Sequence, residues 1–264
     1  NGTKWWEVSV SSSDLNGSAR VLQAGGNAPS LNNNVIQFFT ISSPGNATDF
    51  GDLSYSGGNS MGSASSRTRA LFATDSHYNT INYVTIATTG NSANFGDTIY
   101  TGRYKCGLSS QTRGIIAGGN TTPTSPATDL DNIDLVTIAS TGDAQDFGNL
   151  SEGRAFTASC SSPTRGVFAT GYRKSTTAAT NTVDYITIAS TGNATDFGDM
   201  SGARYAADGS SNSTRAIISG GYQAPAYINT IEYLTISSTG NSQEFGDMTV
   251  AKNHHGSGSS PTRV

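Results

Sequence analysis

The sequence predicts an all-β protein built from five copies of one unit of four short strands. A Phe-Gly-Asp or Phe-Gly-Asn triplet occurs five times, at intervals of 45 to 52 residues. An Ile stands nine residues before the Phe of every triplet, an interval that never varies. Turn-forming residues recur about every 8 to 12 positions, and no segment has the apolar period of a helix. Repetition at this length indicates a supersecondary module.

Each unit also contains an Arg that follows the Phe by 18 or 19 residues. The large variation in length therefore falls between this Arg and the next Ile, where we expect a loop. A residue that recurs in every unit is expected to have the same structural role in each. We therefore expect a structural role for the Phe of the triplet and for the Arg that follows it. The predicted anchors are Phe50, Phe95, Phe147, Phe197 and Phe245, with Arg69, Arg113, Arg165 and Arg215.

The fourth unit illustrates the four predicted strands. Residues 154–160 form a small, polar first strand, and residues 165–169 form the second after a Ser-Ser-Pro-Thr turn. Residues 182–188 form the third, which carries apolar side chains on both faces. The fourth strand ends at residues 197–199. A third strand that is apolar on both faces is typical of a sheet packed between other layers.

Four-stranded units of this length predict a β-propeller, in which blades pack face to face around an axis. The first strand of each blade lines the crowded axis, and it is small here, as in residues 61–64 and 106–109. We expect a five-bladed ring of antiparallel blades. A segment at 1–17 precedes the propeller of residues 18–264, whose units cover approximately 18–53, 54–98, 99–150, 151–200 and 201–248.

The repeat resembles the kelch repeat. A kelch blade has an Arg before its first strand, a glycine pair after its second, a Tyr in its third, then an aromatic anchor and a Met or Leu. The fifth unit offers these in order, as Arg204, Gly220-Gly221, Tyr233, Phe245 and Met248. The resemblance covers nearly the whole chain from about residue 18 and implies a propeller fold. It says little about function, because propellers have many functions.

Two departures and one further likeness qualify this resemblance. Phe replaces the usual kelch Trp, and the glycine pair becomes Thr74-Asp75 in the second unit and Thr170-Gly171 in the fourth. Residues 184–200 are also similar to kelch-like repeats in virion proteins of tailed bacteriophages, particularly marine ones. That likeness implies a virion structural protein.

The two ends of the chain leave three arrangements open. Residues 249–264 read as a further first strand, which would close the ring by completing the first blade. Trp5 and Trp6 then lie outside the ring and are expected to contact a partner, because exposed indoles favour interfaces. Alternatively, residues 5–9 form the innermost strand of the first blade, or the chain continues into further blades.

No catalytic or metal-binding set is expected. Asp-Phe-Gly lacks the accompanying motifs of a kinase and is interpreted as a turn element. The recurring acids near each triplet are expected to cap turns and pair with the recurring arginines rather than bind calcium. His254 and His255 are adjacent in a strand and so form a poor chelate. Cys106 and Cys160 are expected to be small buried thiols.

The loops that vary in length from unit to unit are the candidate binding surface. Loops between the second and third strands open on one face of a propeller, and variable loops on a rigid scaffold are where binding sites concentrate. Tyr and Arg are the residues that anchor interfaces. The candidate binding residues are Tyr78, Tyr172, Arg173, Lys174, Tyr222 and Tyr227.

Composition narrows the functional classes. Only 13% of residues are charged and the net charge is −4, which argues against a nucleic-acid binder. No run of apolar residues is long enough for a transmembrane helix, and no cofactor motif is present. We expect a non-enzymatic structural or adhesive module of a virion or extracellular surface filament, part of an oligomeric assembly, that binds protein neighbours or surface glycans. A sugar-active or oxidase-type propeller enzyme and an intracellular adaptor are the alternatives.

Overall fold

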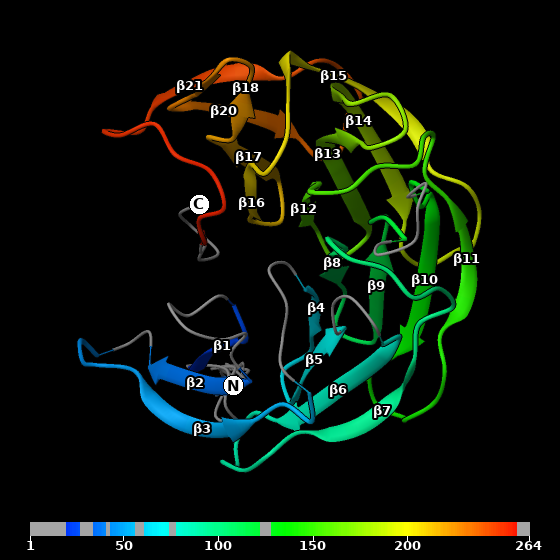
Figure 1. The fold of residues 1–264 in the computed structure, drawn as a ribbon, viewed down its shortest axis with the longest axis vertical. Helices are drawn as coiled ribbons and strands as arrows, with labels where there is room; N and C mark the ends of the chain where they lie inside the picture. The colour runs from blue at the N-terminus through cyan, green and yellow to red at the C-terminus, as the bar shows by residue number, and fades with distance from the viewer. Residues whose placement is uncertain are drawn as a thin grey trace, which may run out of the picture.

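The computed structural model describes residues 20–26, 34–40, 43–55, 61–73, 78–121 and 128–257. Five antiparallel sheets are arranged around one axis as the blades of a propeller (Figure 1). The part of the chain that is described contains no helix. The predicted all-β fold and the number of blades are therefore confirmed.

The blades follow one another along the chain, and within each the strands run from the axis to the rim. Blade 1 has three described strands, β1 (Arg20–Ala24), β2 (Val35–Thr40) and β3 (Thr48–Asp52). Blade 2 has β4 (Gly62–Ser65), β5 (Arg69–Ala73), β6 (Thr80–Thr85) and β7 (Ala93–Asp97). Blade 3 has β8 (Cys106–Ser109), β9 (Arg113–Ala117), β10 (Asn132–Thr137) and β11 (Gln145–Asn149).

The last two blades carry longer hairpins. Blade 4 has β12 (Ala158–Ser161), β13 (Arg165–Arg173), β14 (Ala178–Thr187) and β15 (Thr195–Arg204). Blade 5 has β16 (Asp208–Ser211), β17 (Arg215–Ser219), β20 (Thr230–Thr235) and β21 (Gln243–Asp247). A small hairpin of β18 (Tyr222–Gln223) and β19 (Ala226–Tyr227) projects between β17 and β20.

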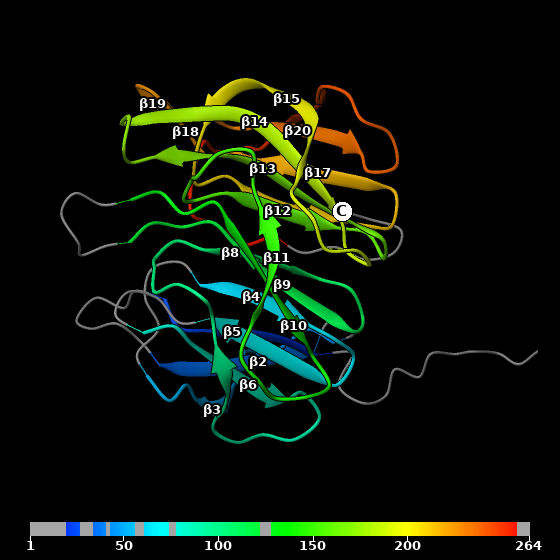
Figure 2. The same ribbon diagram turned by 90° about the vertical axis from the view of Figure 1, so that its right-hand side faces the viewer.

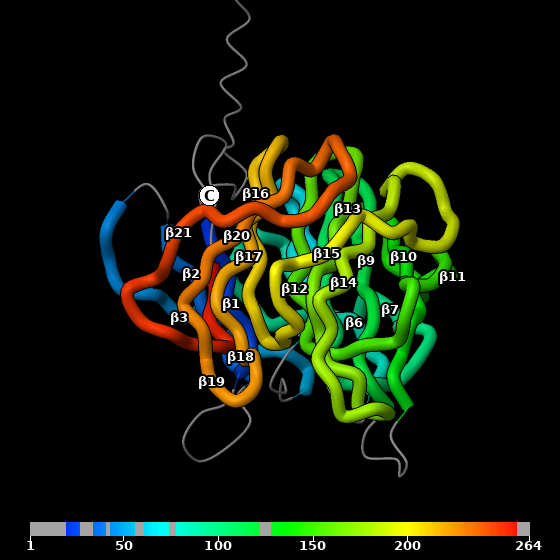
Figure 3. The backbone as a smooth tube through the Cα atoms, turned by 90° about the horizontal axis from the view of Figure 1, so that it is seen from above, coloured from blue at the N-terminus to red at the C-terminus, as the bar shows by residue number. Residues whose placement is uncertain are grey.

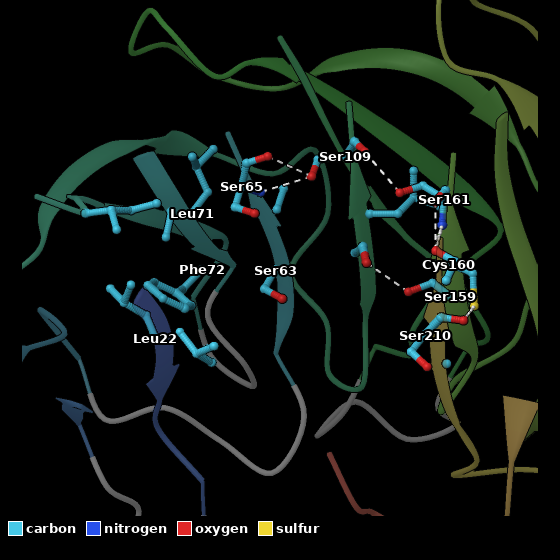
Figure 4. Close-up of a pocket in the computed structure, with 18 of the residues that line it drawn as sticks. Leu22, Ser63, Ser65, Leu71, Phe72, Ser109, Ser159, Cys160, Ser161 and Ser210 are labelled. Carbon is cyan, nitrogen blue, oxygen red and sulfur yellow. Dashed lines mark hydrogen bonds between the residues drawn. The ribbon is translucent and has the colours of Figure 1, made fainter. Parts of the chain in front are cut away.

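The inner strands explain why the sequence places small residues there. Hydroxyl groups of serines link the inner strands of successive blades around the axis: Ser109 Oγ donates to the Ser65 carbonyl at 2.8 Å, and Ser161 Oγ donates to the Ser109 carbonyl at 3.0 Å (Figure 4). Ser211 Oγ continues the series to the Ser161 carbonyl at 2.7 Å. Larger side chains would hold these strands apart, so the small inner strand sets the close approach of the blades.

Four seams between successive blades share one set of contacts. The Phe of the triplet lies in the outermost strand, where Phe50, Phe95, Phe147 and Phe197 are buried. Its carbonyl accepts a 2.7 Å hydrogen bond from the glycine of a turn in the next blade, as from Gly240 N–H to Phe197. The amide of Asp199 in turn donates to Asn241 Oδ1 at 3.0 Å. Asp-Phe-Gly is thus part of a strand and not, as expected, a turn.

The glycine of the triplet is required by this seam. Gly198 has φ of 139°, which disfavours side chains, and a Cβ there would lie 2.6 Å from the backbone of Gly240. Gly51, Gly96 and Gly148 meet the next turn in the same way. The backbones therefore pack directly on one another at each seam.

The recurring arginines also cross the seams, but their partners differ from those expected. The guanidinium of Arg165 donates to the Ile236 carbonyl of the next blade at 3.0 Å, and it stacks over Tyr185 at 4.6 Å. Arg20, Arg69 and Arg113 bond the equivalent carbonyls. The expectation that the acids near each triplet pair with the arginines is therefore wrong. Buried ion pairs join other residues, with Arg154 Nη2 at 2.9 Å from Asp184 Oδ2 and Arg204 Nη2 at 2.7 Å from Glu232 Oε2.

The fifth anchor departs from the pattern. Phe245 is 54% exposed, and a Cβ on Gly246 would meet nothing within 4 Å. Among the described residues no turn of another blade covers it, and a gap separates the strands drawn for blade 5 from those drawn for blade 1 (Figure 1). The prediction that every anchor Phe is buried is wrong for Phe245. Arg215 is likewise exposed, although it stacks over Tyr233 at 4.6 Å.

The segment after β21 enters the gap. Figure 1 shows it, in red, turning from the rim toward the axis, and Figure 3 shows the same turn from above. Within the expected closing strand, residues 251–257 form no strand, and residues 258–264 lie outside the described residues. Trp5 and Trp6 also lie outside them. Closure by a terminal strand and partner contact through these Trp residues therefore stay predictions.

Candidate functional site at the axial opening

The candidate loops of blades 4 and 5 are ordered hairpins rather than irregular turns. In blade 4, β13 and β14 extend beyond the sheet, with Tyr172 opposite Ala179 and Arg173 opposite Ala178. In blade 5, Tyr222 pairs with Tyr227 across β18 and β19. Both hairpins project on the same side of the propeller, at the left of Figure 2. The extra strand pairing carries these side chains to a fixed height above the blades.

Aromatic side chains from three blades meet beside these hairpins. Three predicted residues take part, together with three aromatic residues and a histidine that sequence reasoning did not select. We call this set the aromatic surface: Tyr104, Phe156, Tyr172, Tyr205, Tyr222, Tyr227 and His254.

The rings form one continuous series. Tyr104 stacks on Phe156 with centroids 3.9 Å apart, and Tyr205 lies 5.8 Å from Phe156 and 4.9 Å from Tyr172. Tyr222 lies 5.4 Å from Tyr205. Such offset and tilted arrangements are the favourable ones for aromatic pairs. Mutual packing therefore holds the rings in place before any ligand binds.

The surface remains partly open to solvent. Tyr227, at its end, is 54% exposed, and the other tyrosines are partly exposed. Burial raises the pKa of Tyr205, and the neighbouring Tyr222 and Tyr172 raise it further. The phenol of Tyr205 is therefore protonated at neutral pH. It offers an apolar face with a hydroxyl that can donate or accept a hydrogen bond.

The aromatic surface borders the opening of the axial channel. A cavity of about 400 Å³ lies there, within the range of small-ligand pockets. Phe156 and His254 line it, together with Lys105 and Asp208. Lys105 Nζ is engaged, since it donates to Thr98 Oγ1 at 2.7 Å and to the Tyr100 carbonyl at 2.6 Å. A second cavity of about 390 Å³ follows along the axis between the inner strands (Figure 4).

The missed aromatic residues share a backbone signal. The inner strands β8, β12 and β16 are each preceded by one residue in the left-handed region, and a residue of the segment after β21 has the same conformation. These residues are Tyr104, Phe156, Ala206 and His254, with φ of 60°, 56°, 53° and 47°. The sequence shows them two residues, or in blade 3 one residue, after a recurring Arg or Lys. Two aromatic residues at this strained position, Tyr104 and Phe156, are a signal that could have identified them in the sequence as candidate binding residues.

The remaining candidate residues lie apart from the aromatic surface or have structural partners. Tyr78 stacks on Tyr55 with centroids 4.3 Å apart, at the junction of blades 1 and 2. Arg173 forms an ion pair with Glu152 at 3.1 Å. The amide of Lys174 donates to Asp129 Oδ1 at 2.8 Å, and the residue is exposed. The structure therefore brings three of the six candidates together.

Potential nucleophiles near the axis lack the groups that would activate them. Cys106 and Cys160 are free and buried, and burial raises the pKa of the Cys106 thiol to about 12 and that of Cys160 further. Ser219 Oγ lies 3.0 Å from His255 Nε2, but Ser219 is buried and His255 Nδ1 has no partner among the described residues. A serine nucleophile needs its histidine oriented by a third group. The arrangement does not supply one.

The described residues offer neither a metal site nor a membrane-spanning helix. No group of three or more His, Cys, Asp or Glu side chains is placed to hold a metal ion. No helix there is long and apolar enough to cross a membrane.

The sequence was also compared with known proteins. No family model matches it, and no curated protein matches it. The class of protein therefore comes from the fold and the site. The chain is a repeat protein with a β-propeller fold, and its axial opening is bordered on one side by an aromatic surface.

Proposed function

We propose that the protein is a non-enzymatic structural or adhesive module of a virion or surface filament, and that its aromatic surface binds a surface glycan. The observation that carries the binding proposal is the convergence of five tyrosines, Phe156 and His254 from separate blades at one opening. The kelch-like character of the repeat and its likeness to phage virion repeats support the assignment to a particle surface.

The chemistry of the surface favours a sugar ring. The C–H groups on the flat face of a pyranose carry partial positive charge, and they are attracted to the negative face of an aromatic ring. The tyrosine hydroxyls can exchange hydrogen bonds with sugar hydroxyls at the ring edge. The adjoining cavity of about 400 Å³ can take one or two sugar units.

The site is better suited to binding than to catalysis. Glycoside hydrolysis uses two carboxyl groups facing each other across the bond. Asp208 is the one carboxylate lining the described part of this cavity. An enzyme of the alternative class would turn over the glycan that it binds, whereas we expect the bound glycan to be released unchanged.

The binding test compares two exposed tyrosines. A glycan array selects a ligand, and calorimetry then measures its dissociation constant for wild type, Tyr227→Ala and Tyr78→Ala. Tyr227 and Tyr78 are 54% and 47% exposed, so they are matched in accessibility. We expect Tyr227→Ala to weaken binding about tenfold or more, and Tyr78→Ala to leave it unchanged. Absence of any glycan ligand, or equal loss in both variants, would refute the proposed site.

The particle assignment has its own test. An antibody raised against the folded chain is expected to label intact virions or surface filaments of the source. Labelling confined to the interior of cells would favour the adaptor alternative instead.

A further inference from the structure

One position of the inner strands departs from the repeat in blade 5. Asp208 begins β16 and pairs with Ser219 of β17. The same register position holds an uncharged residue in blades 2 to 4, namely Gly62, Cys106 and Ala158. Crowding at the axis explains why these residues are small, but it does not explain a carboxylate.

The residue opposite Asp208 departs from the repeat as well. Ser219 replaces the alanine of the other four blades, which is Ala24, Ala73, Ala117 or Ala169. The Ser219 hydroxyl lies 3.0 Å from Nε2 of His255, in the segment that turns toward the axis beside β16 (Figure 1). Asp208 and His255 both line the cavity of about 400 Å³ at the axial opening. Blade 5 therefore makes this end of the channel polar and negatively charged.

The carboxylate of Asp208 has no hydrogen-bond or ion-pair partner in the described part of the chain. Its charge nevertheless acts on neighbouring groups. Burial raises the pKa of the Cys160 thiol, and Asp208 raises it further. Burial lowers the pKa of His255, and Asp208 opposes that shift. Asp208 thus lies close to the inner strands without being neutralised by them.

The basic groups that line the cavity do not compensate this charge. Lys105 Nζ is bonded to Thr98 Oγ1 and to the Tyr100 carbonyl. Burial lowers the pKa of His254, and His255 lowers it further, so the imidazoles are neutral at pH 7. A cation that enters the cavity therefore meets one carboxylate that is open to pairing.

The rest of the wall suits the ring and hydroxyl groups of a sugar. Phe156 supplies an aromatic ring, whose negative face attracts cations as well as C–H groups. Thr157 is 9% exposed, and its Oγ1 has no hydrogen-bond partner among the described residues. Nδ1 of His255 is also buried and unpaired there. Buried polar atoms are normally satisfied, so these two atoms favour an occupant that carries hydroxyl groups.

We propose that the cavity binds an amino sugar, a ring with a free amino group, as one unit of the glycan on the aromatic surface. The ammonium group donates a charge-assisted hydrogen bond to Asp208, and the ring lies against Phe156. This inference rests on the proposed glycan binding and adds the class of sugar. An N-acetylated sugar is a poorer ligand, because its amide carries no charge.

The test compares matched sugars. Tetrasaccharides of glucosamine and of galactosamine, and their fully N-acetylated counterparts, are titrated into the full chain by calorimetry at pH 7. We expect wild type to bind the amino form of one sugar about tenfold more tightly than its N-acetylated form. Asp208→Asn keeps the size of the side chain and removes its charge, so it should abolish this preference. Asp208→Ala should do the same, and it introduces the residue that blade 4 has at this register position.

Asp247→Asn is the control for net charge. Asp247 is exposed at the rim of blade 5, and its substitution removes one negative charge just as Asp208→Asn does. We expect the preference for the amine to persist in this variant. Thermal unfolding is expected to be unchanged in both Asp208 variants, because the carboxylate has no partner to lose.

The outcomes separate this inference from the proposed function. Glycan binding that is weakened by Tyr227→Ala but shows no preference for the amine, or a preference that survives Asp208→Asn, would overturn the amino-sugar site alone. Absence of binding to any glycan would refute both. A lysine-containing peptide that binds through Asp208, where both amino sugars fail, would also overturn the site, since the cation would then come from a protein neighbour.

Discussion

The blade 4–5 seam and the free face of blade 5 are built from the same residues but differ in burial. Phe197 is 2% exposed and Phe245 is 54% exposed, although both lie in a Phe-Gly-Asp triplet and pack edge-on against a tyrosine of their own blade. The difference is the turn at Gly240, which covers Phe197 and has no counterpart over Phe245 in the described part of the chain. The repeat motif therefore encodes half of an interface, and the neighbouring blade decides whether that half is buried.

The comparison predicts its largest effect at the two anchors themselves. Phe197→Ala is expected to cost about 3–5 kcal/mol of unfolding free energy, since it removes a buried aromatic side chain and leaves a cavity. Phe245→Ala is expected to cost less than about 1 kcal/mol in the dilute protein, as an exposed substitution does. Urea denaturation of both variants measures the difference. Equal losses would show that Phe245 is buried in solution.

A smaller difference in stability is expected between substitutions of the glycines that follow Phe197 and Phe245 in the two triplets. Gly198 and Gly246 have similar φ, 139° and 146°, so alanine is strained to the same degree at both. At Gly198 the added Cβ also meets the backbone of Gly240, and overpacking of this kind costs about 1–3 kcal/mol. Gly198→Ala should therefore be less stable than Gly246→Ala by about that amount. Thermal unfolding of the two variants measures this difference. Because the backbone strain is the same in both, the difference reports the clash with the Gly240 backbone. Equal stabilities of Gly198→Ala and Gly246→Ala would contradict the close backbone contact at the seam.

The smallest expected effect is a pH dependence in the packing of the segment after β21, which contains His254 and His255, against blade 5. Burial lowers the pKa of His254, and His255 lowers it further; burial also lowers the pKa of His255, against the opposing effect of Asp208. The docked state therefore favours neutral imidazoles. Docking should be complete above the ordinary histidine pKa of 6.5 and should weaken as pH falls below it.

Amide hydrogen exchange measures this pH dependence. After correction for the intrinsic rate, protection of the His254 amide is expected to fall between about pH 7.5 and about pH 5.5. The Gly192 amide, which donates to the Phe147 carbonyl at 2.7 Å and lies in a seam that contains no histidine, is the control and should not change. Parallel behaviour of the two amides would exclude titration of the histidines as the cause.

The sequence predicted the blades because their signals are local. The constant interval between Ile and Phe fixes the hairpin of the third and fourth strands, and the alternation of apolar side chains fixes their faces. The small inner strand followed from the crowding of an axis. Burial of Phe245 was predicted incorrectly because it depends on a contact outside the unit, which repetition alone cannot supply.

The candidate site was predicted in part for a similar reason. Tyr172, Tyr222 and Tyr227 were selected because they lie in variable segments. Tyr205 and Phe156 were missed because they lie in fixed segments, where a structural role is the default expectation. The meeting of the two groups depends on the register of the extended β13–β14 hairpin. Nothing in the composition of residues 172–181 distinguishes that hairpin from an irregular loop.

The most direct test of the open fifth seam is the exchange rate of the Gly45 amide. Gly90, Gly142, Gly192 and Gly240 each donate their amide to the Phe of the preceding blade, and all four are expected to exchange slowly. In dilute protein we expect the amide of Gly45, the corresponding turn glycine of blade 1, to exchange at close to its intrinsic rate. Protection of Gly45 equal to that of Gly240 in the dilute monomer would contradict this account, since it would mean that blade 5 already covers the turn.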